Sequence, residues 1–405
     1  MPQTDSEDTY FRRGLGLKAE VQPALRSEYG SALVQAIKDS DFTLQVGRLR
    51  FRLARSLGFC YGVDRAVEYA YETCRKFPGR RIYLVGEIIH NPHVNQQLVE
   101  MGVRFLFPDS SGAFDFSEVV PEDVVIIPAF GVRLGDFRAL RNIGCVLVDT
   151  TCGSVLNVWK RVETYSRDGF TSLIHGKHYH EETRATSSQV QRHPGGHYLI
   201  VRDMAETERV CAFIGGDLEG AALLQMFRER CSDGFDPDRH LGRVGVANQT
   251  TMLASESLAI AHRIGEAIAS RYGEESLPER FRSFDTICSA TQDRQDAVLE
   301  LIVDPPDLMI VVGGYNSSNT NHLAHLCSER TRTFHIESAL CIDPEAGTID
   351  HKQIMGEKRF TDEDWMPAGP VEIGLTAGAS TPDSLIGATM ERILLLVGED
   401  PAVSG

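Results

Sequence analysis

Residues 145–152, CVLVDTTC, decide the kind of fold. A short β-prone apolar run is followed directly by polar residues and a cysteine, and a helical pattern comes next. The same succession of apolar run, polar residues and amphipathic helical stretch recurs from about Leu49 to the C-terminus. Strands that alternate with helices in this way are expected of parallel sheets. The sequence therefore predicts an α/β fold.

Seven further apolar runs extend this pattern along the chain. With the first run, the strand candidates are Ile82–Val85, Val124–Ile127, Cys145–Val148, Ser172–Ile174, Tyr198–Val201, Val244–Ala247, Leu308–Val312 and Val371–Leu375. The clearest helix follows Gly62, where apolar residues recur at the spacing of one helical face: Val63, Ala66, Val67, Ala70 and Tyr71.

Composition bounds the class of protein. The chain has 405 residues, of which 42% are hydrophobic and 24% charged, the balance of a soluble globular protein with two or three domains. A formal charge of −16 argues against a nucleic-acid footprint and against attraction to an anionic membrane. Any anionic ligand must therefore be bound through local geometry.

The cellular compartment follows from segments that the sequence lacks. No apolar run approaches the roughly 20 residues that span a bilayer. The start, MPQTDSEDTY, resembles neither a secretory signal nor a transit peptide. Nine cysteines, odd in number and without CxxC pairs, fit a reducing compartment. A cytoplasmic protein is expected.

Residues 1–48 differ from the rest of the chain. They are polar and mixed in charge, with weak helical periodicity around Ala32–Lys38. We expect a partly ordered accessory arm outside the catalytic core.

Polar motifs follow the predicted strands: GEIIHN, PAFG, DTTC, HGKHYHEET, NQTT, GGYNSSNTNH and TAGAST. Ligands of open α/β sheets bind at the carboxyl ends of strands. So many polar strand ends indicate one site shared by several sheets.

Three cysteines stand at strand-to-helix transitions, in GFCYGVDRA, VDTTCGSV and FDTICSATQDRQDA. A thiol near a helix N-terminus is favoured as a thiolate. Singly, each could be a core residue, but together Cys60, Cys152 and Cys288 suit an iron–sulfur cubane with one iron free for substrate. They also hint at three related units. The other six are interpreted as small buried hydrophobes: Cys74, Cys145, Cys211, Cys231, Cys327 and Cys341.

Two further groups could carry chemistry. The turn at 313–319 offers hydroxyls, amides and backbone N–H groups as a phosphate cradle without Lys, although it could be only a helix N-cap. A dense titratable group follows the strand candidate at 172–174 and could serve acid–base chemistry, anion binding or a metal: His175, His178, His180, Glu181 and Glu182. Its spacing does not match the HExxH zinc motif. His90 and His93 form a second pair.

Taken together, GFCYGVDRAV, EIIHNPHVN, PAFG, DTTC, HGK…HEET, GFDPDR, VANQTTML, TICSATQDRQDA, VVGGYNSSNTNHL and GASTPD resemble the 4-hydroxy-3-methylbut-2-enyl diphosphate reductase family. The resemblance runs from about Leu49 to the C-terminus and is closest to the longer cyanobacterial and plant form, whose extension the N-terminal arm also resembles.

The resemblance implies three pseudo-repeated α/β domains around a central iron–sulfur cluster, each supplying one cysteine. The expected division is an extension at 1–48 and domains at 49–151, 152–284 and 285–405.

The resemblance also implies roles, carried over motif by motif. One 4Fe-4S cluster with an open iron would be held by Cys60, Cys152 and Cys288. Glu182 would relay protons and Thr250 would orient the substrate hydroxyl. The diphosphate would be bound by His90, His180, Ser317, Ser318, Asn319 and Ser380.

The implied reaction is the last step of the non-mevalonate isoprenoid precursor pathway. The allylic hydroxyl leaves as water with two electrons and two protons, giving isopentenyl and dimethylallyl diphosphates. The resemblance implies ferredoxin or flavodoxin as the electron donor.

Three departures mark this sequence. Phe130 stands where the shorter bacterial form has a histidine, which supports the longer form and removes one diphosphate donor. His178 stands where a tyrosine is common. After Thr151 the chain has CGSVLNV where the family usually has CPWVSKV, so the surroundings of Cys152 differ while the ligand is retained.

Two other functions would use the same three cysteines. A non-catalytic iron–sulfur sensor would need the cysteines but not the relay at Glu182 and Thr250. A structural zinc protein would be colourless, whereas an iron–sulfur protein is brown.

Overall fold

The computed structural model describes residues 9–284 and 286–399, so residues 1–8 of the expected arm lie outside the description. Within that part, the chain divides into two compact units. Unit 1 comprises the residues up to Arg12, Arg80–Gly86 and Arg104–Cys288. Unit 2 comprises Arg13–Gly79, Glu87–Val103 and the residues from Ser289 onward. The units are described one at a time below.

Unit 1 contains two parallel sheets, one of five strands and one of four. The first has the order β1 (Tyr10–Phe11), β7 (Val146–Asp149), β6 (Val124–Ile127), β4 (Ile82–Val85), β5 (Arg104–Leu106), with α5 (Leu134–Ile143) packed on it. The second has the order β11 (Phe281–Ser283), β10 (Val244–Asn248), β8 (Thr171–His175), β9 (Tyr198–Val201).

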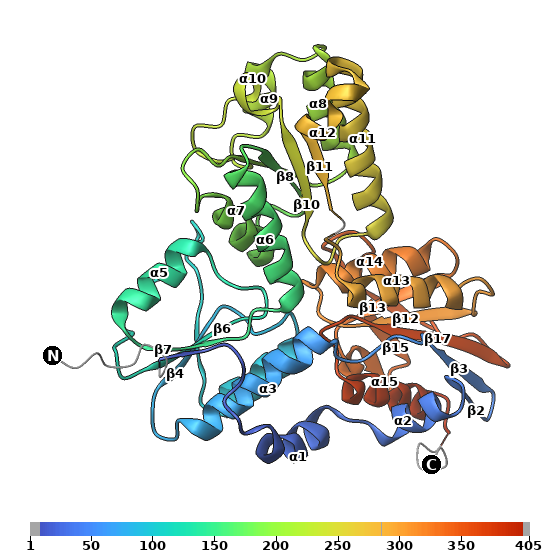
Figure 1. Ribbon diagram of the computed structural model, residues 1–405. Coiled ribbons are helices and arrows are strands. Elements are labelled where there is room, and N and C mark those ends of the chain that lie inside the picture. Colours follow the sequence, from blue (N-terminus) through green and yellow to red (C-terminus); the bar gives the residue numbers. More distant parts are fainter. Residues whose placement is uncertain (1–8, 285, 400–405) are drawn as a thin grey trace. The chain divides into compact units, whose positions relative to one another are not determined.

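Helices cover both faces of the four-stranded sheet. One apolar cluster joins it to α6 and α7, and another to α8 and α11. The helical segments of this part are α6 (Gly153–Arg167), α7 (Glu181–Val190), α8 (Met204–Gly215), α9 (Gly220–Met226), α10 (Pro237–His240), α11 (Ala254–Tyr272), the 3-10 turn Glu274–Ser276 and α12 (Leu277–Arg280) (Figure 1).

Unit 2 is built on one mixed sheet of eight strands. Its order is β14 (Ile342–Asp343), β15 (Thr348–Lys352), β13 (Arg332–Ile336), β12 (Leu308–Val312), β17 (Val371–Ala377), β3 (Leu49–Leu53), β2 (Thr43–Val46), with β16 (Arg359–Glu363) paired to β15. Its helical segments are α1 (Lys18–Tyr29), α2 (Ala32–Asp39), α3 (Tyr61–Lys76), α4 (Pro92–Glu100), α13 (Ser289–Leu301), α14 (Ser318–Ser328), the 3-10 turn Ala339–Cys341 and α15 (Asp383–Leu396).

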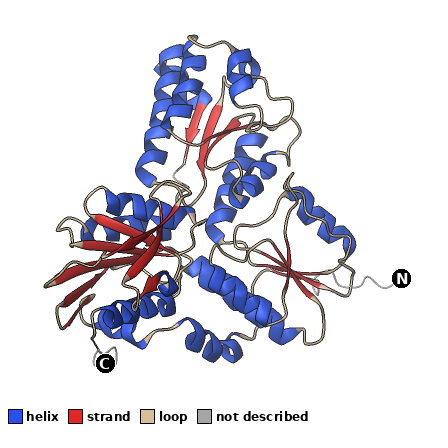
Figure 2. Cartoon of the chain, turned by 180° about the vertical axis from the view of Figure 1, so that it is seen from behind, coloured by secondary structure: helices blue, strands red, loops and turns tan. Residues whose placement is uncertain are grey.

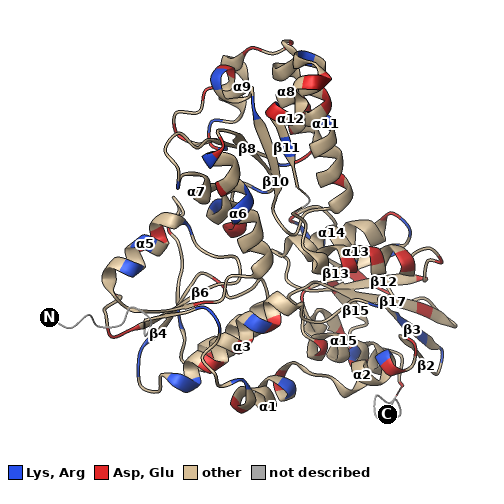
Figure 3. Cartoon of the chain, viewed as in Figure 1, with Lys and Arg blue, Asp and Glu red and all other residues tan. Residues whose placement is uncertain are grey.

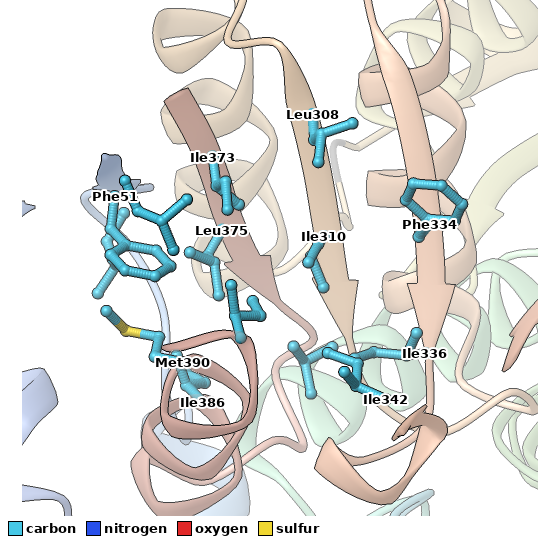
Figure 4. Packing of buried hydrophobic residues seen from close by; sticks show 14 of the residues in the cluster. Phe51, Leu308, Ile310, Phe334, Ile336, Ile342, Ile373, Leu375, Ile386 and Met390 are labelled. Atoms are coloured by element: carbon cyan, nitrogen blue, oxygen red, sulfur yellow. The ribbon is translucent and has the colours of Figure 1, made fainter. Parts of the chain in front are cut away.

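The eight-stranded sheet has a core on each face. Alternate residues of its central strands pack against α2 and α15, as Figure 4 shows for Ile310, Leu375, Ile386 and Met390. The opposite residues of the same strands pack against α13 and α14. Helices therefore cover both faces (Figure 2), as the continuous apolar runs of β12 and β17 require.

These observations confirm the α/β fold. The strand candidates at 82–85, 124–127, 198–201 and 308–312 match the observed strands, and the other four differ by one or two residues at one or both ends. The sheets number three in the described residues, but the domain boundaries expected at residues 48, 151 and 284 stay a prediction.

The N-terminal arm is more ordered than expected between Thr9 and Arg48. The Glu72 side chain on α3, which is almost fully buried, accepts hydrogen bonds from the backbone N–H groups of Leu15 (2.5 Å) and Leu17 (3.0 Å). Lys18 pairs with Glu68 one turn earlier at 2.7 Å. Carboxylates on α3 thus accept hydrogen bonds from backbone N–H groups of the arm. These contacts with α3 order the arm, although its own helical periodicity is weak.

None of the helices in residues 9–284 and 286–399 is long and apolar enough to cross a bilayer.

Candidate active site

The proposed cluster cysteines all lie between a strand and a helix, as predicted. Cys60 is the N-cap residue of α3, and its N–H donates to the Ala379 carbonyl at 3.1 Å within unit 2. Cys152 is the N-cap residue of α6 in unit 1, and its N–H donates to the Ala129 carbonyl at 2.9 Å. Neither side chain caps its helix.

Cys288 follows β11 and directly precedes α13. Its N–H donates to the Thr250 carbonyl at 3.3 Å, within unit 1. All three proposed ligands are half-buried, so a thiolate there can reach a ligand while its backbone is held by a neighbouring loop. Helix N-termini favour the thiolate form.

Burial raises the pKa of most of the other cysteines. Burial raises the pKa of Cys74, Cys145 and Cys211 to about 11 and that of Cys327 to about 12. These thiols stay protonated at neutral pH, which fits their interpretation as small apolar residues. Cys231 is half-buried, and burial raises its pKa as well.

In unit 1, Glu182 and Thr250 form a buried pair. The Glu182 Oε1 atom accepts the Thr250 backbone N–H at 2.6 Å, and Oε2 accepts the Thr250 hydroxyl at 3.0 Å. Glu182 lies in the first turn of α7, and Thr250 lies two residues beyond the end of β10. The structure therefore brings the predicted relay carboxylate and the predicted hydroxyl-orienting residue into direct contact.

His180 caps the same helix. Its Nδ1 atom accepts the Glu182 backbone N–H at 3.2 Å. An acceptor Nδ1 places the proton of a neutral imidazole on Nε2, so Nε2 can donate to an anion. The Phe130 ring packs edge-on against the His180 ring at 5.6 Å. The Phe130 ring thus supports the His180 imidazole.

The other histidines of the predicted titratable group both have lowered pKa values. His175 is fully buried, its Nδ1 lies 2.9 Å from the Ser257 hydroxyl, and burial lowers its pKa to about 4. Burial also lowers the pKa of the half-buried His178, while Glu181 is exposed. Glu182 contacts Thr250 directly, and His180 contacts the Glu182 backbone N–H.

Gln249 is a positioning residue that the sequence reasoning did not single out. Its Oε1 accepts the Lys177 N–H and the Thr183 hydroxyl, each at 3.1 Å, and its Nε2 donates to Thr251 at 2.8 Å. It ties the loop after β10 to the loop after β8. Its place in the NQTT motif, next to Thr250, was the available signal.

In unit 2, His90 is buried at the end of a loop that precedes α4. Its Nδ1 lies 2.9 Å from Glu87 Oε2, and the Asn316 amide donates to the same carboxylate at 3.1 Å. Because the carboxylate accepts, Nδ1 carries a proton and the ring is fixed in orientation. Glu87 and Asn316 were missed, although Glu87 stands in the quoted GEIIHN motif.

The serine and asparagine turn lies beside His90 in unit 2. A Cβ on Gly314 would fall 2.5 Å from the His90 carbonyl oxygen, so only glycine allows this approach. Ser317 caps α14 by accepting from the Thr320 N–H (3.3 Å) and hydroxyl (3.0 Å), which leaves its own hydroxyl hydrogen to donate. The N-cap interpretation is thus correct for Ser317 and is compatible with ligand binding.

Asn319 offers an unused donor. Its Oδ1 accepts the Ala379 N–H at 2.9 Å, whereas its buried Nδ2 has no partner among the described residues. A buried donor without an acceptor is costly unless a ligand supplies one. Ser318 is buried on the same turn, and the half-buried Ser380 accepts from the Asn91 amide through its carbonyl at 2.8 Å.

Arg294 fixes the segment before Cys60. It is almost fully buried on α13, and it donates to the carbonyls of Gly58 at 2.5 Å and Ala290 at 3.0 Å. Arg294 belongs to the TICSATQDRQDA motif, so one motif supplies both a proposed ligand and a support for the loop of another.

The chain is similar to known proteins over most of its length. The family described as LytB protein matches residues 51–394. The 4-hydroxy-3-methylbut-2-enyl diphosphate reductase of Gloeobacter violaceus is 48% identical over 96% of this chain and 93% of its own length. That of Cyanothece sp. is 46% identical over 98% of this chain and 97% of its own length.

Two solved structures are similar as well. A structure of (E)-4-hydroxy-3-methyl-but-2-enyl diphosphate reductase, the terminal enzyme of the non-mevalonate pathway, has a TM-score of 0.53 and 29% identity. It covers 85% of this chain and 98% of that one. The Plasmodium falciparum reductase has a TM-score of 0.61 and 22% identity over 86% of this chain and 88% of its own, which supports the fold alone.

Proposed function

The chain belongs to the LytB family of iron–sulfur reductases, and from this premise we propose how its residues carry out the reaction. Its function is that of 4-hydroxy-3-methylbut-2-enyl diphosphate reductase, the terminal enzyme of the non-mevalonate isoprenoid pathway. The substrate is therefore an allylic diphosphate. The single observation that carries the mechanism is the buried Glu182–Thr250 pair.

We propose one 4Fe-4S cluster with three protein ligands, Cys60, Cys152 and Cys288. The fit rests on chemistry seen in the chain: these three thiols are half-buried beside helix N-termini, whereas burial raises the pKa of Cys74 and Cys145. When bound, such a cluster supplies electrons and, at its open iron, Lewis acidity toward the substrate hydroxyl.

The Glu182 carboxyl is the proposed proton relay. Thr250 donates to both of its oxygens, which fixes the orientation of the carboxyl group. A carboxyl that is nine-tenths buried or more exchanges protons with its immediate partners rather than with bulk water. The Thr250 hydroxyl donates to Glu182, so its oxygen lone pairs can accept a hydrogen bond from the substrate hydroxyl and orient that group.

Neutral and histidine donors are proposed to bind the diphosphate in place of Lys and Arg. His180 presents Nε2–H, and Asn319 presents an unpartnered amide, while Ser317 keeps a free hydroxyl hydrogen. Charge-assisted hydrogen bonds of this kind hold a diphosphate strongly. The further proposed donors are His90, Ser318 and Ser380.

The electron donor and the compartment stay proposals. Ferredoxin or flavodoxin is the proposed electron donor, since the reaction uses two electrons that arrive one at a time. The cytoplasmic location rests on composition and cysteine usage.

Anaerobic turnover tests the function. Cluster-containing protein with chemically reduced ferredoxin should convert 4-hydroxy-3-methylbut-2-enyl diphosphate to isopentenyl and dimethylallyl diphosphates, identified by mass spectrometry. Protein that keeps an intact cluster but releases neither product would contradict the proposed mechanism and favour the sensor.

A further inference from the structure

A hollow of about 240 Å³ lies in unit 1, outside the proposed site. It is lined from the carboxyl end of β7, from α5, from α6 and from the end of α7. None of the proposed cluster, relay or diphosphate residues lines it. It is therefore a separate candidate for ligand binding.

Aromatic side chains form much of its wall. Tyr10, Phe137 and Trp159 line the hollow and are half-buried, and the Tyr10 and Phe137 rings meet edge to face at 5.9 Å. Leu156 adds an aliphatic surface from α6. Such a lining suits a flat ring, because aromatic side chains stack well on other π faces.

The exposed part of the lining is basic. Arg12, Lys160 and Arg192 are exposed, while Glu163 lies 3.7 Å from Arg192. Asp149 is buried and already accepts the hydroxyls of Tyr10 and Thr151, both at 2.5 Å. Cations thus outnumber free carboxylates around this hollow in a protein of net charge −16; the basic residues of α5 and α6 are coloured in Figure 3. The mouth favours an anionic group.

One lining group lacks a partner. The Trp159 indole nitrogen is out of contact with solvent and has no hydrogen-bond acceptor among the described residues. A Cβ on Gly131 would lie 2.4 Å from the Trp159 ring, and Gly131 has a φ of +75°, so the indole is pressed against a backbone that only glycine provides. The Trp159 ring is therefore held in a fixed orientation as one wall of the hollow.

We propose that this hollow binds a small flat-ringed anion, with the ring among Tyr10, Phe137 and Trp159 and the anionic group beside Lys160 and Arg192. Its volume exceeds the roughly 150 Å³ that holds a benzene in an engineered cavity, so two fused rings fit. An arene carboxylate and a purine monophosphate share this chemistry. Thr151 lines the hollow and adjoins Cys152, so the ligand contacts the turn that carries a proposed cluster ligand.

Calorimetric titration of the cluster-containing protein tests the proposal. The probes are 2-naphthoate, AMP and, as an anion without a ring, octanoate. The chain has two tryptophans, and Trp365 is fully buried in the unit 2 core, so a change in tryptophan fluorescence on titration reports Trp159.

Three variants sharpen the test. The double variant Lys160→Ala/Arg192→Ala should weaken binding about tenfold, since each exposed ion pair is worth up to about 1 kcal/mol. Leu156→Trp fills the hollow and should abolish binding. Arg167→Ala removes an exposed cation from the same helix outside the lining and should leave binding unchanged.

Saturable 1:1 binding of 2-naphthoate identifies an arene carboxylate site, and preferential binding of AMP identifies a nucleotide site; either result supports the proposal. No saturable binding of either ring-bearing probe would overturn it. Equal effects of the double variant and Arg167→Ala, or octanoate binding as tight as that of the ring-bearing probes, would overturn it too.

Discussion

Replacing Thr250 by Val should slow the reductase while leaving its fold and cluster in place. Valine matches threonine in shape but lacks the hydroxyl that donates to Glu182 Oε2 at 3.0 Å. The backbone N–H of residue 250 still donates to Oε1. The variant therefore removes one of the two anchors of the relay carboxyl and the group proposed to orient the substrate hydroxyl.

The size of the effect follows from the charge on the acceptor. Hydrogen bonds to charged groups contribute about 1.5–3 kcal/mol. If that stabilisation is lost from the transition state, kcat/KM falls roughly 10- to 150-fold. Because the residue acts on the reacting hydroxyl, we expect most of the loss in kcat.

Thr183→Val is the matched control. Thr183 is also buried, lies next to Glu182 in the chain, and donates to the neutral Gln249 amide oxygen at 3.1 Å. Anaerobic steady-state kinetics at equal iron content compare the two variants. A Thr250→Val enzyme as fast as wild type, or no slower than Thr183→Val, would refute the proposed role.

Other predictions concern the cluster and pH. Alanine at Cys60, Cys152 or Cys288 should abolish cluster-bound iron after anaerobic reconstitution, whereas Cys145→Ala should retain it. Iron analysis and visible absorption measure the bound cluster. Full iron retention in one of the three variants would exclude that cysteine as a cluster ligand. Burial holds the pKa of His175 near 4, below that of an exposed histidine, so the unfolded chain takes up the proton first. The free energy of unfolding should be highest above about pH 6.5 and should fall as the pH drops towards 4, by about 2 kcal/mol between pH 7 and 5. Urea unfolding at several pH values measures this. A urea midpoint that does not change with pH, or a His175→Gln variant whose free energy of unfolding changes with pH as steeply as that of wild type, would contradict the prediction.

Strands were predictable where apolar runs are buried on both faces. β4, β6, β9 and β12 follow from such runs alone. The hairpin of β15 and β16 was not predicted, because its residues are mostly polar and half-exposed and carry no clear alternation. β15 pairs antiparallel with β13, β14 and β16.

The sequence could predict which residues form the candidate site, but not which of their side chains contact one another. Cys60 and Cys152 could be placed at strand-to-helix transitions from local patterns. The Glu182–Thr250 contact joins residues 68 positions apart, and no local pattern reports such a pairing. The support of His90 by Glu87, three residues earlier, also emerged only in the structure, since a motif does not show which side chain faces which.

Turnover by Glu182→Gln is the measurement that tests the account most directly. Glutamine keeps the shape of the side chain and can still accept the Thr250 N–H, but it cannot relay a proton. With iron content and cluster spectrum equal to wild type, the account predicts substrate binding without product. Isopentenyl and dimethylallyl diphosphate formation at the wild-type rate would contradict it.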